Sequence, residues 1–428
     1  MNGIRVKKSL GELQNKGLAN VQTGPFGTVL KASEYSDHGV PVISVGEIKY
    51  GHLKISDNTP TISEKTKERL PQFVLKTGDI VFGRKGAIDR NAIISAEQTG
   101  WFLGSDGIRL RLSEEIDSVF VSYQLRSSAV GKWLLQNSSG SIMPSLNQKV
   151  LDRLPIWLPE VDEQKKIAAV LSALDAKIDC NNRINAELEA MAKTLYDYWF
   201  VQFDFPDANG KPYKSSGGKM VYNATLKREI PVGWRIDELG NISSLIRRGL
   251  SPSYVELGGI AVLNQKCIRE HKISFLDARR HAIVLEAEDE RLLHHFDVLI
   301  NSTGVGTLGR VAFVKRLNEE KTTVDSHVTI VRANSKRIHL EYLAWTVLRF
   351  QTVIEAAANG STGQVELNKA FLEELNIVVP DTALQKSFSA FVSPLVKVMA
   401  AKEKEVEHLT QLRDWLLPML MNGQVTVA

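Results

Sequence analysis

The chain has 428 residues, which is enough for two or three domains of ordinary size. Hydrophobic residues make up 43% and charged residues 24% of the chain, and this balance excludes a disordered protein. The net charge of +4 permits nucleic-acid binding but does not by itself argue for it. The two cysteines lie in segments of different type, and no long apolar run is present. We therefore expect a cytoplasmic protein with neither a disulfide framework nor a membrane span.

Residues 1–160 are expected to form a β-rich domain. Short apolar runs bounded by Gly, Asp and Asn are typical of strands. A helical pattern follows near residues 117–136, and a loop rich in turn residues comes after it. The apolar runs are PVISV (41–45), DIVFG (79–83), AIISA (92–96) and IRLRL (108–112).

A long helix is predicted within residues 161–203. Its apolar positions step by four and three residues, as in the series Ile167, Leu171, Leu174 and Ile178. A helix of roughly 38 residues would be about 57 Å long. Three asparagines, Asn181, Asn182 and Asn185, interrupt the apolar seam. Two interpretations stay open: the centre is frayed or kinked, or a buried Asn fixes the register with a partner helix.

The second half of the chain repeats this order of elements. Residues 204–232 are dense in Gly, Pro, Ser and Lys and are interpreted as the connection between domains. A second β-rich domain is expected at 233–380, and a second heptad pattern predicts a helix within 381–428. Because Pro394 falls inside that pattern, the second helix is expected to start late or to be broken there. The strand candidates of this half are AVLNQ, DVLIN, RVAFV and VTIVR.

An internal repeat links the two halves. The stretch LNQKVLDRLPIWLPEVDEQKKI begins at Leu146 and matches LNKAFLEELNIVVPDTALQKSF, which begins at Leu367. A repeat this long indicates two whole domains. We predict an α+β fold in which two β-rich domains are separated by two long antiparallel coiled-coil helices, with a pseudo-two-fold repeat. Matched pairs, each 221 residues apart, are Asn147/Asn368, Leu154/Leu375, Pro159/Pro380 and Gln164/Gln385.

Corresponding loops of the two halves carry different polar residues. The segment GDIVFGRKGAIDRNAII (78–94) aligns with FDVLINSTGVGTLGRVAFV (296–314), so that Arg84-Lys85 corresponds to Ser302-Thr303. The glycines at 304–309 fit a dinucleotide fingerprint, but a strand-like pattern follows them, which favours a hairpin loop. Cations and hydrogen-bonding side chains are what proteins use to contact phosphates and base edges. Two domains that bind different DNA sequences would need such changes in their loops. Neutral divergence of surface residues after duplication is the open alternative.

Other turns supply further candidates for DNA contacts. Gln22-Thr23 precedes the turn GPFG, Arg247-Arg248 occupies a comparable place in the second half, and Gln265-Lys266 follows the strand AVL. Ordinary solvated turns remain the alternative for each. The candidate DNA-binding residues are Thr23, Arg84, Lys85, Arg90, Arg247, Arg248, Gln265, Lys266, Ser302 and Thr303.

Catalytic motifs are absent from the sequence. It contains no G-x-x-x-x-G-K-[ST] phosphate loop, no Asn/Asp-Pro-Pro-aromatic tetrapeptide, no G-x-S-x-G elbow and no H-E-x-x-H or paired C-x-x-C metal site. The histidines His281, His294 and His295 lack acidic or cysteine partners at ligand spacing. The sequence therefore predicts a protein that positions other molecules and is not itself a catalyst.

The sequence resembles a known family, the specificity subunit of type I restriction–modification enzymes. Residues 158–179 and 188–204 resemble the central conserved helix of that family, and 412–427 resembles its C-terminal counterpart. Residues 23–48 resemble the opening of a target-recognition domain, and 230–242 the lead-in to a second one.

The resemblance implies a division of labour. Each target-recognition domain would read one half of a bipartite site in double-stranded DNA. Two methylation subunits with S-adenosylmethionine, and restriction subunits that use ATP and Mg, would supply the chemistry, so this chain would hold no cofactor. If the helices act as a ruler of about 50 Å, the half-sites would be centred about 10–15 bp apart. The alternatives are the recognition part of a fused restriction–methylation enzyme, or a coiled-coil adaptor without DNA binding.

Overall fold

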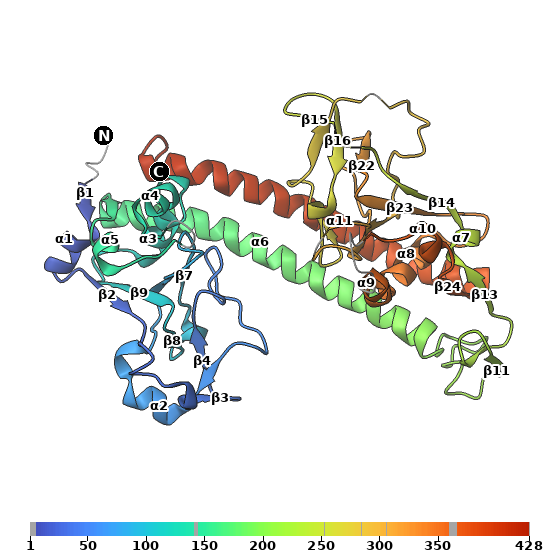
Figure 1. The fold of residues 1–428 in the computed structure, drawn as a ribbon, viewed down its shortest axis with the longest axis horizontal. Helices are drawn as coiled ribbons and strands as arrows, with labels where there is room; N and C mark the ends of the chain where they lie inside the picture. Colours follow the sequence, from blue (N-terminus) through green and yellow to red (C-terminus); the bar gives the residue numbers. More distant parts are fainter. Residues whose placement is uncertain are drawn as a thin grey trace. The chain divides into compact units, whose positions relative to one another are not determined.

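The chain folds into α-helices and β-sheets that form two compact units. The computed structural model describes residues 6–140, 144–251, 253–283, 285–304, 306–358 and 366–427 (Figure 1). The two longest helices each contribute one segment to unit 1 and one to unit 2. This confirms the predicted class of two β-rich domains with two long helices. Unit 1 consists of Met1–Ile178 and His408–Ala428, and unit 2 of Asp179–Glu407.

Unit 1 contains two four-stranded sheets among its described residues. The order is β2-β9-β6-β7 in one sheet and β3-β5-β4-β8 in the other. Neighbouring strands are antiparallel, except for the parallel pair β4 and β8. The strands are β2 (Ala19–Thr23), β3 (Tyr35–Ser36), β4 (Val40–Ile43), β5 (Thr61–Ile62), β6 (Ile80–Gly83), β7 (Asn91–Ile93), β8 (Phe102–Leu103) and β9 (Gly107–Leu112).

Unit 2 repeats this topology strand for strand. Its sheets have the orders β14-β23-β20-β21 and β15-β19-β16-β22, again with one parallel pair, β16 and β22. The duplication seen in the sequence is therefore a duplication of whole sheets. The strands are β14 (Ser243–Arg248), β15 (Tyr254–Val255), β16 (Ile260–Leu263), β19 (Arg279–His281), β20 (Val298–Asn301), β21 (Val311–Phe313), β22 (Thr322–Val324) and β23 (Val328–Ala333).

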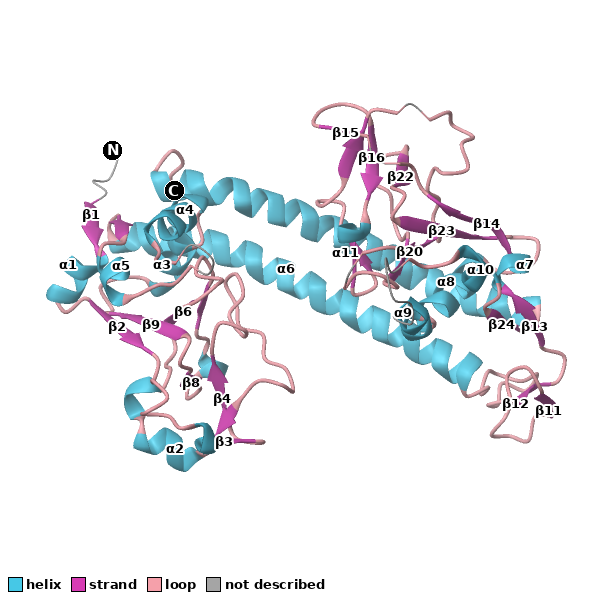
Figure 2. Cartoon of the chain, in the orientation of Figure 1, coloured by secondary structure: helices cyan, strands magenta, loops and turns pink. Residues whose placement is uncertain are grey.

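Short helices and strand pairs complete each unit, and they follow the same order except for α2 in unit 1 and the pair β17 and β18 in unit 2 (Figure 2). In unit 1 they are β1 (Val6–Ser9), α1 (Leu10–Asn15), α2 (Glu64–Arg69), α3 (Ser118–Leu125), α4 (Ser128–Asn137), α5 (Gln148–Asp152) and β10 (Pro155–Leu158). In unit 2 they are β13 (Arg235–Glu238), α7 (Leu239–Ile242), β17 (Ile268–Arg269), β18 (Lys272–Ile273), α8 (Leu340–Arg349), α9 (Gln351–Ala358), α10 (Lys369–Glu373) and β24 (Asn376–Val379).

The best-matched residues of the repeat form hydrogen bonds that stabilise the ends of helices. Asn147 and Asn368 cap α5 and α10, because each side-chain oxygen accepts a hydrogen bond from the first turn of its helix. Gln164 is buried, donates to the carbonyl of Pro159 at 2.8 Å and accepts from the amide of Asp117 at 3.0 Å. The equivalent bonds of Gln385 join Pro380 at 2.8 Å and His339 at 2.9 Å. These residues fix each long helix to its sheet domain.

The two long helices are α6 (Val161–Tyr196), which continues into a π-helical turn, and α11 (Thr382–Asn422). They pack together in both units. In unit 1, Arg413 of α11 bonds Asp175 of α6, and in unit 2 the ring of Phe388 contacts that of Tyr196. Contacts run in opposite order along the two helices, as antiparallel pairing requires.

The expectation that Pro394 delays or breaks the second helix is wrong, because α11 runs through it without interruption. A proline in a helix interior costs about 3 kcal/mol, whereas each buried apolar side chain contributes about 1.5–3 kcal/mol. Phe388, Val392, Val396 and Met399 flank the proline and are all buried. Their combined packing outweighs the cost of the missing hydrogen bond.

The asparagines of the first helix do not interrupt it either. Helix α6 is continuous through Asn181, Asn182 and Asn185, so the frayed interpretation does not describe this structure. Asn181 and Asn185 are buried, and within the described residues both Asn181 side-chain polar atoms and the Asn185 side-chain oxygen have no partner. That a buried Asn fixes the register stays a prediction.

The connection at residues 204–232 is ordered. It contains the hairpin of β11 (Met220–Asn223) and β12 (Arg228–Pro231). The ring of Phe205 stacks on Tyr213 at 4.6 Å and on Trp234 at 5.2 Å, which anchors the segment to the core of unit 2. Its Gly- and Pro-rich composition predicted the turns correctly but not this aromatic packing.

No described helix combines the length and the apolar character that crossing a bilayer demands.

Candidate nucleic-acid interface

The turn between β6 and β7 and the turn between β20 and β21 occupy equivalent places. We call residues 84–90 the first tip and the described residues of 302–310 the second tip. The amide of Leu146 donates to the carbonyl of Arg84 at 2.8 Å, and that of Leu367 to the carbonyl of Ser302 at 2.9 Å. The backbone register therefore gives the pairing of Arg84 with Ser302 that the sequence alignment predicted.

Backbone hydrogen bonds also place a second residue beside each tip. The amide of Arg84 donates to the carbonyl of Asp106, and the amide of Ser302 donates to that of His327, both at 2.8 Å. Asp106 and His327 thus hold equivalent positions beside the two tips. Neither was a candidate from sequence, because they lie in segments outside the two aligned loops.

Arg90 also has a counterpart that was missed. Its carbonyl accepts from the amide of Gly83, as the carbonyl of Arg310 accepts from the amide of Asn301. The sequence did contain the signal, since the alignment of the two loops places Arg90 opposite Arg310. Both tips therefore carry an arginine where the chain returns to the sheet.

The first tip is built from charged and aromatic side chains. The guanidinium of Arg84 lies 5.3 Å from the ring centre of Phe26, which is 59% exposed in the GPFG turn. Lys85 forms an ion pair with Asp106 at 3.6 Å. All of these groups are at least partly open to solvent, so cations, a carboxylate and an aromatic face are presented together.

Arg90 belongs to a neighbouring cluster. Its guanidinium lies 5.5 Å from the ring centre of the exposed Tyr50. The hydroxyl of Tyr50 donates a hydrogen bond to Asp89, and this bond raises the pKa of Tyr50 above its ordinary value. The tyrosine is therefore kept as a neutral hydrogen-bonding group.

The second tip offers neutral hydrogen-bonding groups instead. The hydroxyl of Thr303 lies 2.6 Å from Nδ1 of the exposed His327 and 3.4 Å from the side-chain oxygen of Gln265. Asn301 is buried and donates to the backbone carbonyl of Gln265, which holds that residue against the tip. Lys266 follows on the surface.

Ser302 is not exposed at the second tip. Its side chain is fully buried, and its hydroxyl lies 2.5 Å from that of Thr329. A hydroxyl already bonded in the interior cannot reach a partner outside without a local rearrangement. The neighbouring side chain of Thr303 is partly exposed and open to a partner.

Thr23 and Arg248 are equivalent residues that end β2 and β14. Each is followed by a glycine, Gly24 or Gly249, and a Cβ at either glycine would lie within 2 Å of a backbone carbonyl oxygen, at 1.8 and 1.9 Å. Only glycine permits this close approach of the chain. The two glycines therefore place the preceding side chain beside each tip.

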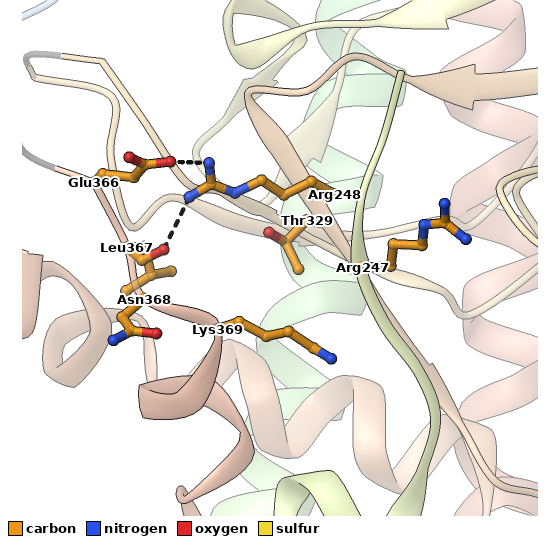
Figure 3. Close-up of a pocket in the computed structure, with 7 residues that line it drawn as sticks. All are labelled: Arg247, Arg248, Thr329, Glu366, Leu367, Asn368 and Lys369. Atoms are coloured by element: carbon orange, nitrogen blue, oxygen red, sulfur yellow. Dashed lines mark hydrogen bonds and ion pairs between the residues drawn. The ribbon is translucent and has the colours of Figure 1, made fainter. Parts of the chain in front are cut away.

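A cavity of about 460 Å³ lies beside the second tip (Figure 3). The guanidinium of Arg248 crosses it and donates to the carboxylate of Glu366 and, at 3.0 Å, to the carbonyl of Leu367. Arg247 extends to the other side of β14 and pairs with Glu290. The cavity is lined by Arg247, Arg248, Thr329, Glu366, Leu367, Asn368 and Lys369.

Equivalent ion pairs brace the base of each tip. Arg111 of β9 holds Asp79 through two bonds of 2.7 Å, and Arg332 of β23 holds Asp297 through bonds of 2.8 and 2.7 Å. The hydrogen bonding with Asp79 raises the pKa of Arg111 above its ordinary value. Both aspartates are buried just before β6 and β20, so paired charges fix the strands that carry the tips.

The described residues contain no cluster of His, Cys, Asp and Glu that could hold a metal ion. What the two units present are cations, amides, hydroxyls and aromatic faces at equivalent places, with different side chains in each. Two related surfaces of this composition are typical of a binding scaffold with two recognition domains.

Comparison with known proteins agrees with this class. The family described as "Type I restriction modification DNA specificity domain" matches residues 10–190 and 255–411, which is more than half of the chain. The MjaIX specificity subunit of Methanocaldococcus jannaschii is 25% identical over 93% of this chain and 89% of its own length. The HindI specificity subunit of Haemophilus influenzae is 21% identical over 90% and 94%. A crystal structure of an S subunit from M. genitalium covers 98% of this chain and 96% of its own, with a TM-score of 0.59 and 16% identity.

The chain therefore belongs to the type I restriction–modification DNA specificity family. It is a DNA specificity subunit with two target-recognition domains and is not itself catalytic. The cofactors of such a system belong to its modification and restriction subunits. The two alternatives from the sequence, part of a fused enzyme and an adaptor without DNA binding, are set aside.

Proposed function

We propose that the first tip and the second tip each read one half of a bipartite site in double-stranded DNA. The observation that carries this proposal is their equivalence in backbone register combined with their different side chains. A shared frame places each tip in the same way, and the changed residues give it a different pattern of donors and acceptors. The two halves of the site then differ in sequence.

The proposed contacts follow the exposed side chains. In unit 1 they are Thr23, Arg84, Lys85 and Arg90, joined by Asp106. In unit 2 they are Arg248, Gln265, Lys266 and Thr303, joined by His327. Arg and Lys suit the acceptors of guanine, Asp accepts from cytosine, and Gln suits adenine. Arg247 and Ser302 are left out, because one lies on the other side of its strand and the other is buried.

The proposed assembly has this chain at its centre in the cytoplasm. Two methylation subunits would dock on the two equivalent units, and restriction subunits would join them. The paired helices α6 and α11 would set the spacer between the half-sites, at about 10–15 bp for a ruler of about 50 Å.

Exchange of tip residues between the units tests this function. The double substitution Arg84→Ser and Lys85→Thr gives the first tip the residues of the second. We expect methylome sequencing of cells carrying the complete system to show a changed base preference in one half of the methylated motif only. The reciprocal substitution Thr303→Lys should change only the other half. A change in both halves with either variant, or in neither with both, would contradict independent reading by the tips.

A further inference from the structure

The two units carry their cations in different places. Both tips carry an arginine at their end, but the first tip also has Arg84 and Lys85 where the second has Ser302 and Thr303. Unit 2 carries two further cations beside its tip instead. Arg248 ends β14 and Lys369 follows the cap of α10. The equivalent residues of unit 1 are Thr23, which ends β2, and Gln148, which follows the cap of α5. Unit 2 therefore has a pair of flanking cations that unit 1 lacks.

These two cations line the cavity of about 460 Å³ beside the second tip (Figure 3). Arg248 donates to the carbonyl of Leu367 and forms an ion pair with Glu366, whose side chain is 54% exposed. Lys369 pairs with Glu373, and its side chain is 62% exposed. Ion pairs this exposed are weak, so a stronger anion can replace either carboxylate.

The cavity shares a wall with the second tip. Thr329 lines it and bonds the hydroxyl of Ser302, and Leu367 bonds the backbone of Ser302. An anion in the cavity would therefore lie next to the residues proposed to read bases. In protein–DNA complexes, contacts to the phosphate backbone likewise position the protein beside the bases that it reads.

We propose that this cavity binds a phosphate of the DNA backbone at the half-site read by unit 2, with Arg248 and Lys369 as its cations. The proposal rests on the proposed function of the tips. A guanidinium has five N–H donors in a fork that matches phosphate geometry, and an ammonium adds a point charge. The exposed Asn368 supplies a further hydrogen-bonding group at the cavity. The flanking cations thus anchor the DNA and leave Thr303 and its neighbours to read bases.

The salt dependence of binding tests the phosphate site. The assay uses the full chain in complex with its methylation subunits and a duplex that carries its methylated motif. Because each neutralised phosphate contributes about 0.9 to the slope of log K against log salt, the pair Arg248→Thr and Lys369→Gln should lower the magnitude of that slope by about 0.9. These substitutions introduce the residues of unit 1. The base preference should stay as in the unsubstituted complex.

Matched variants separate a local site from general charge loss. Arg248→Lys keeps the charge and should keep the slope. Glu366→Gln removes the competing carboxylate and should tighten binding. Arg269→Gln removes an exposed cation of unit 2 that does not line the cavity, and it should change the slope by less than about 0.5. Thermal melting of each variant verifies that it is folded.

Several outcomes would overturn the site. One is an unchanged slope in the double variant, and another is an equal loss in Arg269→Gln. A third is a loss of base preference at one position, which would indicate base reading. If the cavity served free phosphate, the double variant would lose binding of inorganic phosphate and keep its DNA slope, which also overturns the proposal. A failure of the proposed function is seen separately, since the unsubstituted complex would then show no sequence preference.

Discussion

At the scale of single residues, Gly24 shows how a position beside the first tip is determined. A Cβ at Gly24 would lie 1.8 Å from the carbonyl oxygen of Gly104, whereas nothing lies within 4 Å of the same position at Gly27. Both glycines belong to the turn GPFG. Only the first of them is required by the approach of a neighbouring segment.

We expect Gly24→Ala to lower the free energy of unfolding by about 1–3 kcal/mol, because two backbone segments must separate to admit the methyl group. Gly27→Ala is the matched control and should change stability by no more than about 0.5 kcal/mol. Urea denaturation of the full chain measures both. Equal effects of the two substitutions would show that the close approach is not what selects glycine at position 24.

Candidate residues were predicted from sequence with uneven success. Alignment of the two loops paired Arg84 with Ser302 correctly, because the strands around them keep their pattern of apolar residues. It could not show that Ser302 is buried or that His327 lies beside Thr303, since both facts depend on strands distant in the chain. Residue type and local spacing predict which loops are equivalent, whereas exposure depends on the tertiary fold.

At the scale of elements, Asp175 joins three helices of unit 1. This residue of α6 accepts hydrogen bonds from Tyr123 of α3 at 2.6 Å and from Arg413 of α11 at 2.8 Å, with Arg126 at 3.5 Å. Burial alone would raise the pKa of Asp175, but the bonds from Arg413 and Tyr123 outweigh it and the pKa is lowered. The folded protein therefore favours the ionised carboxylate.

A pH-dependent loss of stability should follow from this network. A lowered folded-state pKa gives stabilisation that is present above the unfolded value of 3.8 and is lost as the pH falls through the folded value. We expect Asp175→Asn to lower stability at pH 7 by about 1–2 kcal/mol, with a difference from the unsubstituted chain that shrinks below about pH 4. Asp179→Asn, at an exposed position of the same helix, is the control. A difference that is constant from pH 7 to pH 3 would contradict the assignment.

At the scale of the whole molecule, duplication was the most predictable property. The repeat at Asn147/Asn368 and Gln164/Gln385 predicted two similar domains, and the strand orders of both units agree with it. The course of α11 through Pro394 was not predictable from local propensity, because it depends on how deeply the flanking apolar residues are buried in the tertiary fold. The aromatic anchoring of residues 204–232 was missed for the same reason.

The length of the paired helices should determine the spacing of the target. Removing one heptad from α6 and one from α11 shortens each helix by about 10.5 Å, which corresponds to about 3 bp of DNA. We expect the spacer of the methylated motif to shorten by about that amount while both half-sites keep their sequences. Removal of a heptad from α6 alone misaligns the pair and should abolish methylation. An unchanged spacer in the double deletion would rule out the ruler.

The division of each long helix between the units has a consequence for biosynthesis. Unit 2 is one continuous stretch of chain, Asp179–Glu407, and has all of its parts once that stretch has left the ribosome. Most of unit 1 precedes unit 2 in the chain, yet the core of unit 1 includes Leu420 and Met421, which follow unit 2. Unit 1 therefore completes its core after the whole of unit 2 has been made. Until Met421 has left the ribosome, the apolar surface that α11 covers in unit 1 stays open to solvent and to chaperones.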